Sequence, residues 1–162
     1  MNPAPETVAS RSTPTRDSLA ASPGSAIYRV QDKEGRGPWR PGFSHKWVED
    51  REDHDNLVPW LYEFGRVDQT AIYGMAIGCG CLTLEQLRRW FTESEYRKLQ
   101  RYGYHAVRIK VGRVLAASDI QCVFERAKPL RYDVERVELY SPNTQGERRG
   151  AAAADLRKTP KT

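Results

Sequence analysis

The most constraining feature of the sequence is a change of hydrophobic period between residues 83 and 111. Residues 83–91 read TLEQLRRWF, in which leucines and aromatic residues recur at helical spacing after a Thr-x-x-Gln capping box. Residues 92–95 repeat the capping pattern and predict a second helix over about 94–101. From residue 107 the period becomes two, with one apolar and one basic face. Two adjacent helices followed by strands favour an α+β fold over an alternating parallel sheet.

The remaining elements are short and mostly strands. Asn56 is expected to cap a helix that ends at Gly65, with Pro59 in its first turn. Gly112 permits a bend after the period-two segment. The further predicted elements are a strand over 26–30, the helix over 57–64, a glycine-weakened strand over 70–79, and strands over about 120–124 and 133–140. The sequence therefore predicts a mostly antiparallel sheet of five or six strands with two or three inserted helices.

The composition places these elements in a single compact domain over 26–141. Hydrophobic residues make up 39% of the 162 residues, enough for one modest core. Residues 1–25 are rich in Pro, Ser, Ala and Thr and have almost no large apolar side chains, which predicts a disordered segment. Residues 142–162 predict a flexible basic tail.

Charge and cysteine content exclude several classes of protein. The net charge is +5, but residues 142–162 hold five basic and two acidic residues, so the body is nearly neutral. This weakens the case for specific nucleic-acid recognition. No apolar stretch approaches the ~18 residues of a membrane span. Three cysteines and no secretory signal predict a cytoplasmic protein with reduced thiols.

The three cysteines are possible metal ligands. Cys79 and Cys81 are separated by one residue, whereas paired zinc ligands usually have at least two between them. A fourth ligand beside Cys122 would have to be one of three isolated histidines: His45, His54 or His105. The sequence therefore predicts no metal site and small, buried cysteines. The acidic run 49–55 predicts an exposed loop, with a solvated histidine within it.

The loop 35–42, GRGPWRPG, is the first candidate ligand site. Its three glycines and two prolines exclude a regular element. Arg36 and Arg40 flank Trp39, and guanidinium groups bind phosphate while an indole face stacks on a base. This combination suits a nucleotide or a phosphorylated ligand. The alternative is a surface loop in which Trp39 folds back as a hydrophobic plug.

Arg29 is the second candidate, since it shares a strand face with Ile27. A cation on an apolar strand face is costly unless it is paired or lies in a cleft. Such a residue is suited to an anionic ligand. The alternative is an edge strand from which Arg29 reaches water.

The order of the predicted strands, loop and helices over about residues 26–126 resembles that of small ADP-ribosyltransferase-like domains. In that family a first strand carries Arg or His beside an aromatic residue, as in Tyr28-Arg29-Val30. A middle strand leads into a helix, and a late strand pair carries the catalytic glutamate. The resemblance implies NAD as the cofactor, with Arg29 gripping a phosphate or ribose and Arg36 or Arg40 assisting. It also implies that Tyr73 stacks on nicotinamide and that Gln121 or Glu125 holds the reacting ribose.

The chain departs from this pattern at the glutamate, whose position falls near Gln121. A glutamine accepts a hydrogen bond but lacks the negative charge that stabilises an oxocarbenium-like transition state. Electrostatic stabilisation of this kind is often worth ~3–4 kcal/mol. The expectation is either an atypical transferase or a relative that only binds.

Two hypotheses about function follow, and a third is weaker. The short sequence segments around Arg29 and Arg36 are similar to those of small, uncharacterised proteins of bacteria and their prophages. The first hypothesis is an NAD-dependent ADP-ribosyltransferase-like protein that modifies a host protein or nucleic acid. The alternative is a non-catalytic binding protein or inhibitor, for example against a host defence system, with aromatic residues as interface anchors. The third is nucleic-acid binding through Arg108, Lys110 and Arg113.

We predict that Trp90→Ala lowers the free energy of unfolding by about 3–5 kcal/mol, the usual cost of truncating a buried aromatic residue. The spacing of Trp90 from Leu87 and Phe91 places it on the inner helix face. Chemical denaturation measures the effect. A change under about 1 kcal/mol would show that this face is assigned wrongly.

Overall fold

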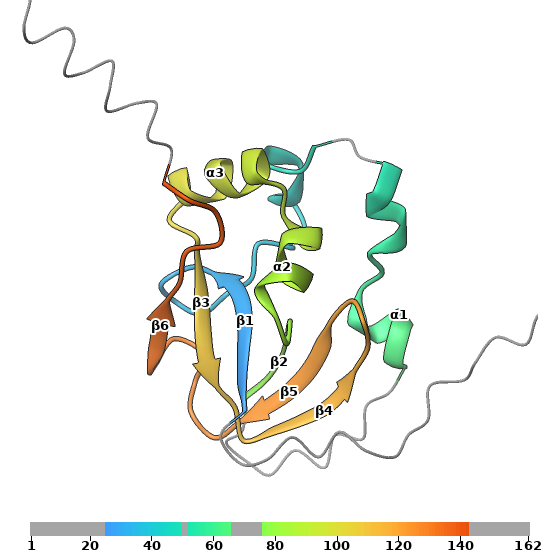
Figure 1. Ribbon diagram of the computed structural model, residues 1–162, viewed down its shortest axis with the longest axis vertical. Coiled ribbons are helices and arrows are strands. Elements are labelled where there is room, and N and C mark those ends of the chain that lie inside the picture. Colours follow the sequence, from blue (N-terminus) through green and yellow to red (C-terminus); the bar gives the residue numbers. More distant parts are fainter. Residues whose placement is uncertain (1–24, 50–51, 66–75, 143–162) are drawn as a thin grey trace, which may run out of the picture.

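Two three-stranded antiparallel sheets form the frame of the protein (Figure 1). The computed structural model describes residues 25–49, 52–65 and 76–142, without the side chains of Asp53 and Asp55. The first sheet has the order β1-β3-β6, and the second has the order β2-β5-β4. Their bounds are β1 Ala26–Gln31, β2 Ala76–Gly80, β3 His105–Lys110, β4 Arg113–Ala117, β5 Cys122–Arg126 and β6 Val134–Arg136. The fold is α+β, as the sequence predicts.

The two sheets are joined where β1 passes the end of β2. Tyr28 and Cys81 form an isolated antiparallel bridge, and each backbone N–H donates to the other carbonyl at 2.8 Å. This bridge covers the edge of β1 that does not face β3. It also brings the residues after Tyr28 next to the glycines of β2. Figure 1 shows β1 and β2 side by side at this junction.

Capping boxes set the start of two consecutive helices, as predicted. Thr83 and Gln86 cap α2 (Leu84–Trp90), and Thr92 and Glu95 cap α3 (Glu93–Arg101). In each box the threonine hydroxyl accepts from the N3 backbone N–H while the N3 side chain accepts from the N-cap backbone.

Among the described residues, no helix has the length and apolar character needed to cross a bilayer.

The segment before residue 65 differs from the expectation. The predicted helix over 57–64 is only α1, Trp60–Phe64, and the acidic run contains the 3-10 helix η2, Glu52–Asn56. Because Val58 precedes a proline, it is biased to an extended conformation, so the helix begins after Pro59 and Asn56 caps nothing. A second 3-10 helix, η1, spans Ser44–Lys46. Gly65 ends α1 at φ 64°, as predicted.

β3 follows the predicted alternation, whereas β5 is buried along its whole length, and the bounds of the strands are shifted. β3 buries Val107 and Ile109 and exposes Lys110. The turn at Gly112 leads into β4, which the sequence analysis did not identify as a separate strand. β5 begins two residues later than expected, and β6 is shorter because Leu139 leaves the sheet and packs in the core. The part of the predicted strand 70–79 that precedes Ala76 lies outside the described residues.

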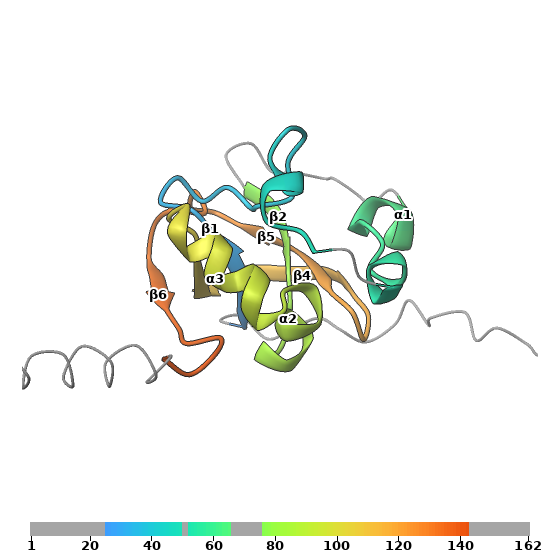
Figure 2. The ribbon, with the colours of Figure 1, turned by 90° about the horizontal axis from the view of Figure 1, so that it is seen from above.

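The core has two parts, one on each side of β1 and β3. The first gathers Trp47, Leu87, Phe91, Leu99 and further residues under α2 and α3. The second lies between the sheets and includes Ile27, Ile109, Val114, Cys122 and Phe124. Figure 2 shows α3 beside the first sheet and α1 at the opposite side of the molecule, beyond the second. Side chains of β1 therefore alternate between two packed layers.

We predict that Gly80→Ala lowers the free energy of unfolding by about 2–4 kcal/mol. A Cβ at Gly80 would lie 2.8 Å from the Tyr28 carbonyl oxygen and 2.6 Å from Ile27 Cδ1, so the junction of the sheets would have to shift. Gly112→Ala is the matched control, because its Cβ would meet Glu125 O at an ordinary 3.5 Å. Urea denaturation of both variants checks this, and equal losses would contradict the close packing at the junction.

Candidate ligand-binding pocket

A pocket of about 700 Å³ opens at the junction of the sheets. Its walls include Arg29 of β1, the loop residues 36–40, residues 77–81 in and just after β2, residues 90–91 at the end of α2, and Gln121 before β5. The volume lies within the range of roughly 300–1,000 Å³ typical of small-molecule sites. Five of the residues that the sequence singles out therefore border one cavity: Arg29, Arg36, Trp39, Arg40 and Gln121.

Arg29 is the unusual residue of this pocket. Its side chain is buried, with 8% of the residue exposed, and its Nη2 donates to the Gly35 carbonyl at 3.4 Å. Its Nε and Nη1 have no hydrogen-bond partner among the described residues. Burial lowers the pKa of Arg29, while Cys79 and Asp32 oppose that shift. The alternative in which Arg29 reaches water from an edge strand is wrong, because β2 and the loop cover it.

Glycines make the space that the guanidinium occupies. A Cβ at Gly78 would lie 2.9 Å from Arg29 Nη1, and a Cβ at Gly37 would lie 3.5 Å from Nη2. Any larger residue at position 78 would push the guanidinium or the Phe124 ring aside. The glycines of β2, which sequence analysis interprets as weak points of a strand, hold open the place where Arg29 lies.

Asp32 fixes the loop after β1. Its carboxylate accepts from the backbone N–H groups of Glu34 and Arg36, and from Arg36 Nε at 2.8 Å. The hydrogen bond with Asp32 raises the pKa of Arg36. Gly35 turns the chain with φ 84°, a conformation that L side chains rarely adopt. The Arg36 guanidinium is thus already engaged by carboxylates, unlike that of Arg29.

Aromatic side chains form part of the pocket wall, among them Trp39, Trp90 and Phe91. Trp39 is 44% exposed, and its ring centroid lies 4.7 Å from that of Trp47, 5.8 Å from His54 and 6.1 Å from Trp90. Trp39 therefore packs on the core with one part and leaves another part accessible. The Arg40 guanidinium lies 4.9 Å from the Phe43 ring centroid. Such a wall is suited to stacking on a planar ligand ring.

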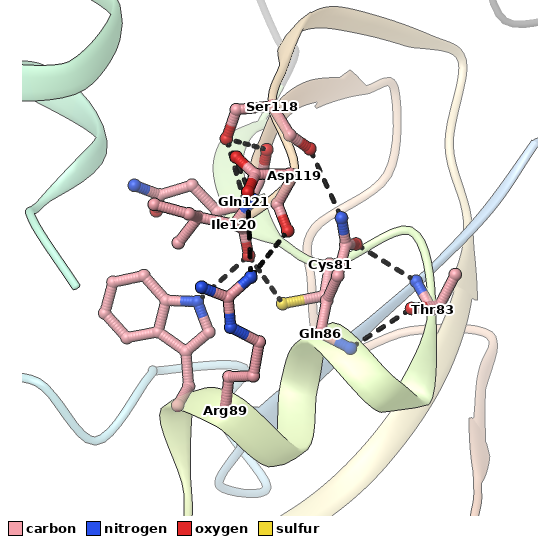
Figure 3. Close-up of polar contacts among 9 residues, drawn as sticks. Cys81, Thr83, Gln86, Arg89, Ser118, Asp119, Ile120 and Gln121 are labelled. Atoms are coloured by element: carbon pink, nitrogen blue, oxygen red, sulfur yellow. Dashed lines mark hydrogen bonds and ion pairs between the residues drawn. The ribbon is translucent and has the colours of Figure 1, made fainter. Parts of the chain in front are cut away.

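The turn that carries Gln121 is hydrogen-bonded to side chains along α2, the helix that follows β2 (Figure 3). Gln86 Nε2 donates to the Ser118 carbonyl at 3.2 Å, and Arg89 Nη1 donates to the Asp119 carbonyl at 3.2 Å. The Ile120 carbonyl accepts from Trp90 Nε1 and from the Cys81 thiol. These contacts hold residues 118–121 against α2 and place Gln121 at the pocket.

Gln121 is buried, and the NH₂ group of its side chain is engaged in two hydrogen bonds. Its Nε2 donates to the Val58 carbonyl and to Glu63 Oε2, each at 2.7 Å. Glu125, the other candidate, lies on β5, accepts from Arg113 Nε at 2.9 Å and is not among the residues that line the pocket. The last residue implied by the resemblance, Tyr73, lies outside the described residues.

The cysteines are free thiols. Cys79 and Cys81 both line the pocket; Cys81 and Cys122 are buried, and Cys79 is half-buried. Burial raises the pKa of all three, that of Cys122 to about 12, so they stay protonated at neutral pH. In the part of the chain that the structure describes, no three His, Cys, Asp or Glu side chains are placed to hold a metal ion.

Sequence reasoning missed two neighbours of the pocket. His54 was expected in an exposed loop, but its side chain is 15% exposed and its Nε2 lies 3.4 Å from the buried Glu95 Oε1. Glu63 was not singled out at all. Both depend on contacts between residues far apart in the chain, and neither lies in a local motif that would have marked it. A histidine within the acidic run was the only available signal.

The fold and the pocket define a small α+β domain with a cationic, aromatic-walled cavity. The model of the Bacteriophage T4 Y00F protein family matches residues 23–139, and the chain belongs to that family. This confirms the expected connection to phage proteins. No curated protein and no solved structure gives a significant match to the chain.

We predict that Arg29→Met raises the free energy of unfolding of the ligand-free protein by about 1–3 kcal/mol, because it removes a buried charge whose donors are unpaired. Thermal and urea denaturation measure this. Arg113→Met is the control with the opposite sign: it leaves the buried Glu125 carboxylate without its partner and should cost about 1–2 kcal/mol. A clear loss of stability in Arg29→Met would show that Arg29 is structural.

Proposed function

We propose that the protein binds NAD in this pocket and acts as an ADP-ribosyltransferase-like protein of its phage family. The observation that carries the proposal is the buried Arg29 guanidinium, with Nε and Nη1 unpaired among the described residues at a cavity wall. A cation in that state is stabilised by an anion that accepts both hydrogen bonds. The N–H groups of Nε and Nη1 point to different sides of the guanidinium, so they suit separate oxygens of a phosphate or pyrophosphate group.

The lining of the pocket suits the two kinds of group in a dinucleotide. The pyrophosphate meets Arg29, with the backbone approaching closely at Gly37 and Gly78. A base or the nicotinamide ring stacks on the exposed part of Trp39, which rings on three sides hold in place. Arg40, at the end of the same loop, adds positive charge near the pocket. Positive charge and a stacking surface in one pocket favour a nucleotide over a simple anion.

Transfer of ADP-ribose breaks the bond between the ribose C1′ and the nicotinamide nitrogen, which keeps the electron pair. The acceptor forms the new bond to C1′ and loses a proton. A carboxylate beside the ribose stabilises the positive charge that develops. The described residues that line the pocket include Gln121 but no Asp or Glu. We therefore expect tight NAD binding and slow transfer.

The second candidate is a binding protein that recognises NAD without turning it over and acts by contact with a host macromolecule. The neutral Gln121 at the pocket, together with the engagement of Glu125 by Arg113, favours it over a fast enzyme. Release of nicotinamide, measured by mass spectrometry, distinguishes the two candidates. Detectable release that depends on Arg29 supports transfer.

We predict that wild-type protein binds NAD in calorimetry and that Arg29→Met weakens binding about ten- to a hundredfold. This corresponds to the loss of charge-assisted hydrogen bonds worth roughly 1.5–3 kcal/mol. Arg108→Ala is the matched control, because Arg108 pairs with Glu135 on the first sheet and does not line the pocket. Circular dichroism checks folding. No binding by the wild type at millimolar NAD would contradict the proposal.

A further inference from the structure

The side-chain amide of Gln121 has an orientation that its surroundings decide. An amide has two N–H donors on one side and a carbonyl acceptor on the other. Its Nε2 lies 2.7 Å from the Val58 carbonyl oxygen and 2.7 Å from Glu63 Oε2. Both neighbours are acceptors, and a carboxylate has no hydrogen to donate. Only the NH₂ group satisfies them, so both donors of the amide are used on this side.

The carbonyl oxygen of the same amide is left for the pocket. Gln121 borders the cavity, and its Oε1 has no hydrogen-bond partner among the described residues. The pocket thus presents an acceptor at this point and no donor. If the amide were reversed, the pocket would present donors, and the oxygen would face two acceptors.

We propose that Glu63 is a positioning residue, which fixes the Gln121 amide so that the pocket selects a ligand carrying a hydrogen-bond donor at that point. The identity of that ligand rests on the proposed function, in which a hydroxyl or amide N–H of NAD is the donor. Glu63 reaches this position from α1, where its backbone N–H donates to the Pro59 carbonyl. The short helix therefore has a role at the pocket although none of its residues beyond Trp60 lines it.

The negative charge of Glu63 explains why position 121 holds an amide. A carboxylate at 121 would face the Glu63 carboxylate and the Val58 carbonyl oxygen with no hydrogen between them. The Glu63 carboxylate and the Gln121 amide thus form a pair. The carboxylate binds the NH₂ side of the amide, and only the neutral carbonyl oxygen of Gln121 is available to a ligand. The hydrogen bond to a carboxylate is stronger than one to a neutral acceptor, which holds the amide more firmly.

Nuclear magnetic resonance tests the positioning role without any ligand. The two side-chain amide protons of Gln121, assigned by the loss of their signals in Gln121→Ala, should exchange with solvent at least tenfold more slowly than those of a free amide. Glu63→Ala should release one proton from protection, whereas Glu63→Gln should keep both protected, because its carbonyl still accepts. Glu52→Ala is the control, since Glu52 is exposed on the neighbouring η2. Two rapidly exchanging protons in the wild type would overturn the proposal.

Calorimetry with NAD then tests the selection of a donor. Glu63→Ala should weaken binding about five- to tenfold while circular dichroism shows that the fold is retained, Glu63→Gln should restore it to within about threefold, and Gln121→Glu should weaken it more than tenfold. Equal affinity of wild type and Glu63→Ala would overturn the proposal. No NAD binding by the wild type contradicts the proposed function alone, because the exchange rates still decide the role of Glu63.

Discussion

Arg29 carries a positive charge into the junction of the two sheets, where the described residues give two of its three guanidinium nitrogens no partner. A buried charge is costly in proportion to how poorly it is compensated. The surroundings reduce this cost only a little, through one long hydrogen bond to Gly35 and the more distant Asp32. Much of the local structure serves to keep the guanidinium in this place. The Tyr28–Cys81 bridge closes the junction, and the missing side chain at Gly78 leaves it room.

The other walls of the pocket are held by similarly local devices. Asp32 folds the loop that brings Trp39 over the cavity, and Gln86 joins the capping box of α2 to the turn before Gln121. Gln86 therefore does two things at once: its oxygen caps a helix and its nitrogen holds the strand connection (Figure 3). The hydrogen bonds of Asp32 and Gln86 thus stabilise the fold and also position the walls of the pocket. A rigid, preformed site of this kind loses little entropy when a ligand binds.

The sequence predicted the local structure well, because local structure depends on neighbours in the chain. Capping boxes at Thr83 and Thr92 and the alternation in β3 are short-range signals, and the structure confirms them. The start of α1 was wrong because the restriction that Pro59 places on Val58 outweighs the capping preference of Asn56. The exposed loop expected around His54 was wrong because burial beside Glu95 comes from a helix about forty residues away.

The candidate site shows the same division. A cation on an apolar strand and an Arg-Trp-Arg loop are visible in the sequence, and the structure places them at one cavity. The pairing of Gln121 with Glu63 joins residues 58 positions apart, and no spacing rule connects them. The role of Gly78 could not be predicted either. A glycine within a strand normally indicates a weaker strand, and only the structure shows that the Arg29 guanidinium occupies the space beside it.

If the unpaired donors of Arg29 bind an anionic group of NAD, a crystal structure of the protein grown with NAD will show the contact. The expectation is that pyrophosphate oxygens lie within hydrogen-bond distance of Arg29 Nε and Nη1 and that a ring of the ligand stacks on Trp39. A pocket that stays empty at millimolar NAD, or a dinucleotide bound elsewhere while Arg29 keeps its place, would contradict it.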